Sequence, residues 1–252
     1  MKMKFQPVSW AGILLFSLFL VLSSCRKENM CDCFKSTGAE KTEIRDVTGF
    51  TKIELNDNVD LRITPGKDFS CRVTAGSKLV GMVTTEVEGN TLVIRNHNKC
   101  NWVRSFENRY TVDVSLPLLE YLYYSGSGDI TSLDTIRCDR FIMDAWTCSG
   151  SIRLMLSCNT SWLTMHTGTG DLTASGSSGV SYVYNAGAGP ADCSKLASGY
   201  TYITSKSTND CYVNVTKEIG AGLFLQGNIF YSGNPYKIEK SEKGEGRLLS
   251  LP

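Results

Sequence analysis

A short glycine-rich phrase returns along the second half of the chain at a nearly constant interval. It first reads Ser125-Gly126-Ser127-Gly128-Asp129 and returns in variants such as Gly168-Thr169-Gly170-Asp171. The residues that end these phrases, here called the marker column, are Asp129, Ser151, Asp171, Pro190, Asp210 and Asn228. Their sequence numbers rise in nearly equal steps of 22, 20, 19, 20 and 18. A period near 20 is typical of a solenoid, in which each coil buries its apolar face only against its neighbours.

The segments between the glycines have the composition of strands, because they are rich in Tyr, Val, Ile, Thr, Trp and Leu. Glycine reaches positive φ without steric cost, so the Gly-x-Gly phrases are expected at corners, where Asn209 replaces glycine once. We therefore predict an all-β fold, an elongated right-handed parallel β-helix with about 20 residues per coil and coils about 4.8 Å apart.

The start of the chain has the pattern of a lipoprotein signal peptide. Lys2 and Lys4 precede an apolar run from Val8 to Leu22, and Leu22-Ser23-Ser24-Cys25 closes it. This ending resembles the bacterial lipobox. The resemblance implies cleavage after residue 24 and acylation of Cys25 by fatty acids that include palmitate. The run is short for an uncleaved membrane anchor. Several acyl chains anchor a protein firmly, so we expect a membrane as one partner and the outer membrane as the location.

The rest of the chain divides into two parts. Residues 25–43 are polar and are predicted to be a lipid-anchored tether, while residues 44–252 are predicted to form a single β-helical domain. Segments such as Lys52–Leu55 and Val59–Ile63 alternate apolar and polar residues, as half-buried strands do. The net charge of +1 lacks the clustered basic excess that nucleic-acid binding needs.

Several phrases together resemble one known family. They are Gly49-Phe50-Thr51-Lys52-Ile53-Glu54-Leu55, Gly89-Asn90-Thr91-Leu92-Val93-Ile94, Leu116-Pro117-Leu118-Leu119, Ser125-Gly126-Ser127-Gly128-Asp129-Ile130 and Gly227-Asn228-Ile229-Phe230-Tyr231-Ser232-Gly233-Asn234-Pro235. The set is similar to the head GIN domain, a family named after auto-transporter adhesins, and departs from it at Gly189-Pro190 and Leu225-Gln226. The resemblance implies a β-helical fold, an envelope lipoprotein and no established biochemical activity. A family label of this kind carries little mechanistic weight.

The acids of the marker column have two interpretations. One is a calcium ladder, but the known calcium-binding solenoid repeat has about nine residues, and acids on alternate coils would lie about 9.6 Å apart, too far to share an ion. The other is a corner role, in which each Asp caps its own turn. We favour the corner role and predict no metal site.

Counting back from the marker column predicts which side chains face the core. The positions eight and six residues earlier are expected to point inward: Tyr121, Met143, Leu163, Tyr182 and Tyr202, and Tyr123, Ala145, Met165, Tyr184 and Thr204. The position five residues earlier has the opposite parity. It predicts an exposed row of candidate ligand-binding residues, Tyr124, Trp146, His166 and Asn185.

An exposed aromatic row beside amide and hydroxyl groups suits a glycan, and a protein surface is the other candidate partner. The alternatives are that the N-terminal strands cover the row or that it only stiffens the sheet. A register error of one residue would turn the row inward.

No motif in the sequence indicates catalysis. His97 and His166 are the only histidines, and Gly-x-Ser-x-Gly, His-Glu-x-x-His and Walker phrases are missing. We predict a non-catalytic envelope lipoprotein without cofactor that acts as an adhesin or binding module. A structural envelope protein and a polysaccharide-degrading β-helix enzyme are the alternatives.

The ten cysteines bear on the compartment. Cys138 and Cys158 are one coil apart, so they could stack at bonding distance, and export makes a disulfide possible. A ladder of buried free thiols is the alternative. No set of cysteines has the spacing of a structural zinc site.

Overall fold

The computed structural model describes residues 37–98 and 109–251 of the chain. They form strands with one short 3-10 helix, η3 (Val80–Met82). The first strands are β1 (Glu40–Arg45), β2 (Lys52–Asp57), β3 (Asp60–Pro65), β4 (Ser70–Gly76), β5 (Val83–Glu88), β6 (Thr91–Asn96), β7 (Thr111–Leu116), β8 (Tyr121–Gly126) and β9 (Ile130–Ser132). The later ones are β10 (Ile136–Cys148), β11 (Ile152–Gly168), β12 (Leu172–Asn185), β13 (Ala191–Ser205), β14 (Cys211–Leu223), β15 (Ile229–Ser232), β16 (Lys237–Glu242) and β17 (Leu248–Ser250).

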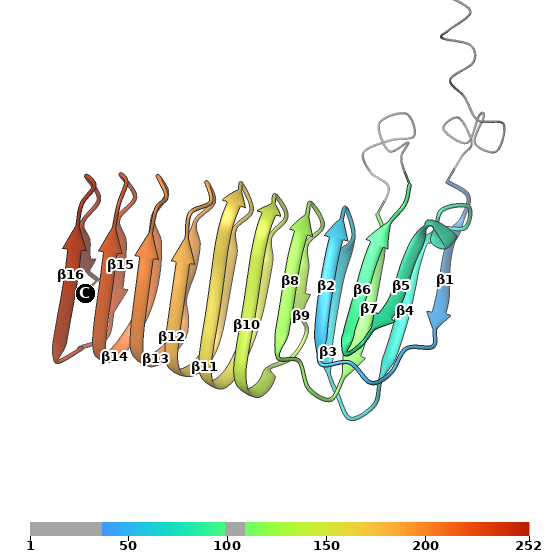
Figure 1. Ribbon diagram of the computed structural model, residues 1–252, viewed down its shortest axis with the longest axis horizontal. Coiled ribbons are helices and arrows are strands. Elements are labelled where there is room, and N and C mark those ends of the chain that lie inside the picture. Colours follow the sequence, from blue (N-terminus) through green and yellow to red (C-terminus); the bar gives the residue numbers. More distant parts are fainter. Residues whose placement is uncertain (1–36, 99–108, 252) are drawn as a thin grey trace, which may run out of the picture.

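The strands from β8 onward stack in parallel as successive coils of one solenoid (Figure 1). Ser161 pairs with Ser181 and Tyr182 pairs with Tyr202, so partners in neighbouring coils are separated by one full repeat of the sequence. Near the C-terminus the repeat is shorter, because Cys211 pairs with Ile229. The predicted all-β solenoid and the predicted length of its repeat are confirmed.

The N-terminal coils do not stack in sequence order. The coil of β2 and β3 lies between that of β6 and β7 on one side and that of β8 and β9 on the other (Figure 1). Beyond them, β4 pairs antiparallel with both β7 and β1, and β5 pairs antiparallel with β6. These antiparallel strands cover the N-terminal end of the solenoid, so its core is not open there.

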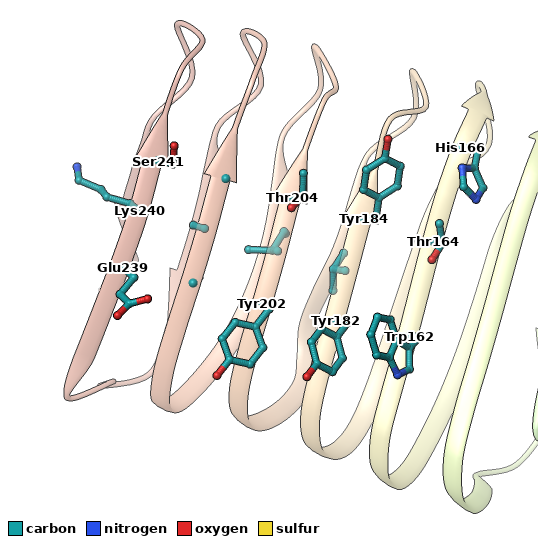
Figure 2. A pocket seen from close by; sticks show the side chains of 15 residues that line it. Trp162, Thr164, His166, Tyr182, Tyr184, Tyr202, Thr204, Glu239, Lys240 and Ser241 are labelled. Atoms are coloured by element: carbon teal, nitrogen blue, oxygen red, sulfur yellow. The ribbon is translucent and has the colours of Figure 1, made fainter.

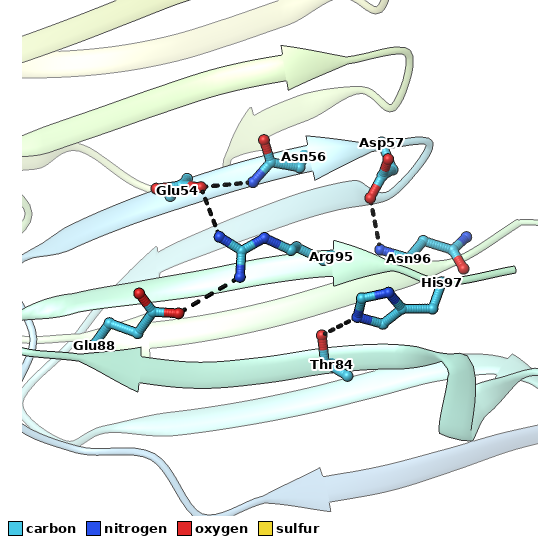
Figure 3. A network of polar contacts seen from close by, with 8 residues as sticks. All are labelled: Glu54, Asn56, Asp57, Thr84, Glu88, Arg95, Asn96 and His97. Atoms are coloured by element: carbon cyan, nitrogen blue, oxygen red, sulfur yellow. Dashed lines mark hydrogen bonds and ion pairs between the residues drawn. The ribbon is translucent and has the colours of Figure 1, made fainter.

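A polar network joins the inserted coil to its neighbours (Figure 3). Arg95 of β6 forms ion pairs with Glu54 of β2 at 3.3 Å and with Glu88 of β5 at 3.5 Å. Asp57 accepts a hydrogen bond from the backbone N–H of Asn96 at 2.9 Å. The contacts of β6 with β2 connect strands that are far apart in the sequence, whereas the pair of Arg95 and Glu88 lies within the hairpin of β5 and β6.

The corner glycines are needed for close approach more than for positive φ. Only Gly168 of the Gly-x-Gly phrases has a positive φ, +106°. A Cβ added at Gly128 would collide with the carbonyl oxygen of Val59, and one added at Gly150 with that of Gly128. Gly170 and Gly189 meet the preceding coil in the same way. The expectation that these glycines serve left-handed turns was therefore wrong at most corners, where the backbones pass too closely for any side chain.

The marker column links successive coils. Asp129 accepts the backbone N–H of Ser151 at 2.9 Å, Asp210 accepts that of Asn228 at 2.8 Å, and Asn228 accepts that of Arg247 at 3.0 Å. The predicted corner role is right, but the partner is wrong, because Asp129, Asp210 and Asn228 accept from the next coil and not from their own turns. Asp171 accepts from the preceding coil, through the hydroxyl of Ser151 at 2.7 Å. Within the described residues, no group of three or more His, Cys, Asp or Glu side chains is arranged to hold a metal ion.

The last coil differs from the others at its inward positions. Lys240 pairs in register with the buried Ala221, and Glu242 pairs with the buried Leu223. Lys240 and Glu242 form an ion pair at 3.1 Å. Charged side chains thus occupy positions that are apolar one coil earlier.

The predicted signal peptide and Cys25 lie outside the described residues, as do Cys31, Cys33 and Cys100. In the described part of the chain, no helix has both the length and the apolar character needed to cross a membrane.

Candidate functional site

Two of the four predicted ligand-binding residues lie together on the surface. Trp146 is 46% exposed, and its ring stacks on that of His166, with centroids 3.9 Å apart and planes 14° apart. Tyr124 and Asn185 are fully buried, so the prediction that they face solvent was wrong. The exposed row predicted from the sequence is therefore reduced to its central pair.

The error comes from one extra residue in each of two strands. Ala145 pairs with Tyr124 and Cys148 with Gly126, so β10 has Trp146 and Thr147 where β8 has one residue. The N–H groups of Ala186 and Ala188 bond to the carbonyls of Met165 and Gly168, so β11 also has one residue more than β12. A count back from the marker column is therefore right within β10 and β11 but wrong by one residue in the neighbouring strands.

The parity of the neighbouring strands is inverted as a result. Met143, Ala145, Leu163 and Met165 are buried as predicted. The residues predicted to be inward but found on the outer face are Tyr121, Tyr123, Tyr182, Tyr184, Tyr202 and Thr204.

Tyr124 and Asn185 support the corners from inside. The Tyr124 hydroxyl donates to the carbonyl of Gly128 at 2.5 Å, and the Asn185 amide donates to that of Gly189 at 3.0 Å. Asn185 also accepts the N–H of Gly187 at 3.1 Å. Both side chains therefore satisfy buried backbone groups of a corner.

A longer aromatic row lies on the same face, here called the aromatic wall: Trp162, Tyr182 and Tyr202 (Figure 2). Trp162 and Tyr182 stack with centroids 3.9 Å apart, and Tyr182 and Tyr202 with centroids 5.4 Å apart. Trp162 and Tyr202 are each 37% exposed. Their regular spacing in the sequence, one repeat from each ring to the next, was the signal that could have identified this row directly.

A second row runs parallel to the first and is here called the mixed ridge. From Trp146 and His166 it continues through Tyr184, whose ring centroid is 5.7 Å from that of His166. Lys206 lies over the rings of both Tyr184 and Phe224, at 5.7 and 5.5 Å, and Lys243 lies over Phe224 at 5.3 Å. From Tyr184 onward the ridge thus alternates aromatic and cationic side chains.

A groove of about 700 Å³ is lined by the aromatic wall and by His166 and Tyr184 of the mixed ridge (Figure 2). Thr164 and Thr204 contribute hydroxyl groups, and Gly220 and Gly222 leave its floor without side chains. A Cβ at Gly220 would lie 2.9 Å from the Tyr202 ring, and one at Gly222 would lie 3.2 Å from the Phe224 ring. The two glycines therefore leave room for the rings beside the groove.

Polar contacts fix the rings around the groove. Asp144 accepts hydrogen bonds from Trp146 Nε1 at 3.3 Å and the Tyr121 hydroxyl at 3.4 Å, and it contacts His166 Nε2 at 2.8 Å. Burial, together with the nearby Asp144 carboxylate, raises the pKa of Tyr121. The Tyr202 hydroxyl donates to Glu218 at 3.3 Å. The ring orientations are therefore set before any ligand arrives.

A smaller hollow of about 260 Å³ lies on the same face, toward the N-terminus, and is lined by Lys52, Glu54, Thr91, Tyr121 and Tyr123. Lys52 pairs with Tyr121 and Glu54 with Tyr123. Tyr121 pairs with Ile142, which pairs with Trp162, so this hollow continues the row of the aromatic wall.

The candidate disulfide residues are neighbours in the stack. Cys138 pairs directly with Cys158, and both are half-buried free thiols. Burial and the neighbouring Cys158 raise the pKa of Cys138 to about 12. The remaining described cysteines, Cys71, Cys148, Cys193 and Cys211, are buried and free.

Residues 49–235 match the family described as "Putative auto-transporter adhesin, head GIN domain". The chain belongs to this family. The head GIN assignment agrees with the resemblance seen in the sequence and places the chain in an adhesin-like family, which indicates a location at the cell envelope or surface.

Solved structures share the head GIN fold. A "putative adhesin" from Bacteroides fragilis is 20% identical over 84% of this chain and 97% of that chain, with a TM-score of 0.75. A "putative lipid binding protein" from Parabacteroides distasonis is 20% identical over 86% and 98%, with a TM-score of 0.66. At this identity the likeness shows the fold alone. None of the curated proteins matches the chain.

Proposed function

We propose that this protein is a non-catalytic binding module that holds a glycan in the groove between the aromatic wall and the mixed ridge. The observation that carries the proposal is the stack of Trp162, Tyr182 and Tyr202 beside an open groove. Flat apolar ring faces pack against the apolar faces of sugars, while a few well-placed polar groups fix orientation. The hydroxyls of Thr164 and Thr204 are such groups.

The rigidity of the site supports this function. The rings stand on strands whose backbones are paired on both sides in the stack, and Asp144 and Glu218 hold the polar atoms of His166 and Tyr202. A ligand therefore does not have to order a loop or many side chains on binding, which lowers the entropic cost of association.

The location follows from the predicted anchor. Acylation of Cys25 would attach the chain to the outer membrane, and the residues between Cys25 and β1 would hold the solenoid away from it as a tether. The tether expected over residues 25–43 is shorter at its end, because Glu40 to Glu43 lie in β1 and pair with β4. The long axis of the solenoid would then present one continuous binding face. Metabolic labelling with a palmitate analogue tests the anchor, since Cys25→Ala is expected to abolish incorporation.

Binding is tested by incubating the purified chain with a glycan array and then measuring affinity for each hit by calorimetry. Trp162→Ala and Tyr182→Ala are expected to weaken binding about tenfold or more, as loss of a central aromatic anchor does. The matched control is Tyr212→Ala. Tyr212 stacks on Phe230, with centroids 5.1 Å apart, but lies outside the groove.

The alternatives give different results. Equal losses in Tyr212→Ala and Trp162→Ala would mean that the variants act through stability. If the native chain binds no glycan, a structural envelope role or a protein partner is favoured. Release of new reducing or unsaturated sugar ends from a bound polysaccharide would instead support the polysaccharide-degrading enzyme.

A further inference from the structure

We propose that the glycan in this groove carries acidic groups, carboxylate or sulfate, which Lys206 and Lys243 of the mixed ridge bind. This inference rests on the proposed function, because it concerns the same groove. It adds the chemical class of the ligand, which neither the aromatic wall nor the family description specifies.

The first observation is the set of contacts that the two lysines make. Lys206 is in contact with the rings of Tyr184 and Phe224, and Lys243 with that of Phe224. Within residues 37–98 and 109–251, neither ammonium group forms an ion pair with a carboxylate. The rings hold the two ammonium groups in place, so two positive charges without a carboxylate partner stand beside the groove.

The second observation is that lysines outnumber carboxylates at this end of the groove, although Glu239 is itself a lining residue. Lys237 contacts Glu218 at 3.1 Å and Glu239 at 2.9 Å, and Lys240 contacts Glu242 at 3.1 Å. With Lys206 and Lys243 included, the cluster holds four lysines against the three carboxylates of Glu218, Glu239 and Glu242, which leaves a net charge of +1. An anionic ligand would meet complementary charge on this ridge, which favours both encounter and orientation.

The third observation is where the charges lie. Lys206 follows Thr204 and Lys243 follows Ser241 by two residues, and Thr204 and Ser241 both line the groove. The N–H groups of Phe224 and Lys243 bond to the carbonyls of Ser205 and Leu223, so Lys206, Phe224 and Lys243 occupy one row in successive coils. Two coil spacings separate the lysine backbones by about 9.6 Å. A chain with more than one acidic group along its length suits this arrangement.

A third cation stands at the other end of the aromatic wall. The guanidinium of Arg140 lies 5.9 Å from the ring centroid of Trp162, and it too has no carboxylate partner in the described part of the chain. Cations therefore flank the groove at both ends, and acidic groups distributed along a ligand could be bound at either one.

The test uses the full chain in detergent and three oligosaccharides with one backbone: neutral, oxidised to uronic acids, and sulfated. We expect one or both acidic probes to bind about tenfold or more tightly than the neutral probe, because hydrogen bonds to charged groups are the stronger ones. Comparing the uronic and sulfated probes identifies the acid. The preference should fall steeply with salt.

The double variant Lys206→Gln and Lys243→Gln is expected to lose this preference and to keep its affinity for the neutral probe. Lys195→Gln is the matched control, because Lys195 is an exposed lysine of β13, the strand that ends directly before Lys206, and does not line the groove. Thermal melting of each variant checks that the fold is retained.

Each outcome has a distinct meaning. Equal or tighter binding of the neutral probe overturns this inference and leaves the proposed function intact. Acid-dependent binding that the double variant retains overturns the assignment to Lys206 and Lys243. If the native chain binds none of these probes and no glycan on the array, the proposed function fails first and this inference falls with it.

Discussion

The carboxylate of Asp129 accepts a hydrogen bond from the backbone N–H of Ser151, 2.9 Å away, and so joins the corner of one coil to that of the next. The same relation recurs between Asp210 and Asn228. At a corner, a backbone N–H no longer points toward a carbonyl of the neighbouring strand. A carboxylate can accept its hydrogen bond instead, as an N-cap side chain does at the start of a helix. Side chains of the marker column thus connect successive coils by hydrogen bonds along one edge of the solenoid.

Replacing Asp129 with Ala is expected to lower the free energy of unfolding by about 1 kcal/mol, which is typical of losing such an acceptor. Asp129→Asn keeps an acceptor oxygen and should lose less. Urea unfolding followed by circular dichroism measures both. Ser127→Ala, an exposed change in the same corner, is the control. Equal stability of Asp129→Ala and the native chain would show that the bond contributes nothing.

Gly150→Ala should destabilise the fold by about 2 kcal/mol, the usual scale of overpacking, because its Cβ would meet the Gly128 carbonyl and lie 2.7 Å from the Tyr124 hydroxyl. Gly81→Ala is the matched control, since nothing lies within 4 Å of its added Cβ. The comparison of melting curves separates close approach from a general effect of glycine substitution. Similar curves for the two variants would contradict the role assigned here to corner glycines.

Tyr124→Phe should cost about 1–2 kcal/mol of stability, because it leaves the buried carbonyl of Gly128 without its hydroxyl donor. Glycan affinity should not change, since Tyr124 is buried away from the groove. Tyr123→Phe, on the outer face of the same strand, is the control for stability. A loss of affinity at unchanged stability would instead restore Tyr124 as a ligand-binding residue.

The effect of Tyr124 on stability should depend on pH. Burial raises the pKa of Tyr124 in the fold, whereas an unfolded tyrosine ionises near pH 10. Its contribution is therefore fully present below about pH 10 and is lost as the pH rises through the higher folded-state pKa. The stability difference between the native chain and Tyr124→Phe should narrow in this alkaline range, as unfolding at pH 8 and at higher pH would measure.

Cys138 and Cys158 are expected to form a disulfide when the chain is exposed to an oxidising compartment, because their backbones are directly paired. Closing a loop of this size stabilises a fold by about 3 kcal/mol. A non-reducing digest should contain a linked peptide pair that reduction separates. Recovery of both thiols in free form from the exported protein would favour the free-thiol ladder.

After reduction, Cys138 should react slowly with iodoacetamide. The thiolate is the nucleophile, and burial together with Cys158 raises the pKa of Cys138 to about 12. Its alkylation rate in the folded chain should therefore keep rising with pH well above 9, whereas unfolding in urea should bring it to the rate of an ordinary thiol. Rapid labelling at neutral pH would contradict this burial.

Gly222→Val should fill the floor of the groove and displace Phe224, whose ring would lie 3.2 Å from the new Cβ. Glycan affinity should fall about tenfold or more, as for loss of a central contact, while stability should change little at this outward position. Calorimetry and melting separate the two effects. Full affinity in this variant would mean that the ligand lies outside the groove.

The coil period could be predicted from the sequence because the glycines recur wherever backbones pass closely at a corner. Which side of each strand faces the core could not be predicted, since one extra residue in β10 and one in β11 give these two strands a different parity from their neighbours when counted from the corner. Trp146 and His166 were placed correctly because they lie in the two strands that share this insertion. Trp162, Tyr182 and Tyr202 were missed because the count assigned the tyrosines to the core.

Other features depend on contacts that sequence order does not encode. The coil of β2 and β3 precedes β6 and β7 in the chain, yet it stacks between them and β8. The partner of Asp129 lies one coil ahead of it, and only the stacked geometry identifies it. Local patterns therefore predicted the repeat, while the tertiary register decided which side chains form the groove.

The ion pair of Lys240 and Glu242 in the last coil has a consequence for assembly. A second molecule that added its strands to β16 would enclose both charged groups between apolar layers, and removing them from water carries a large desolvation penalty. Growth of a fibre by end-to-end addition is thereby opposed at this terminus. The charged pair on β16 thus disfavours the addition of further apolar coils at this edge of the stack.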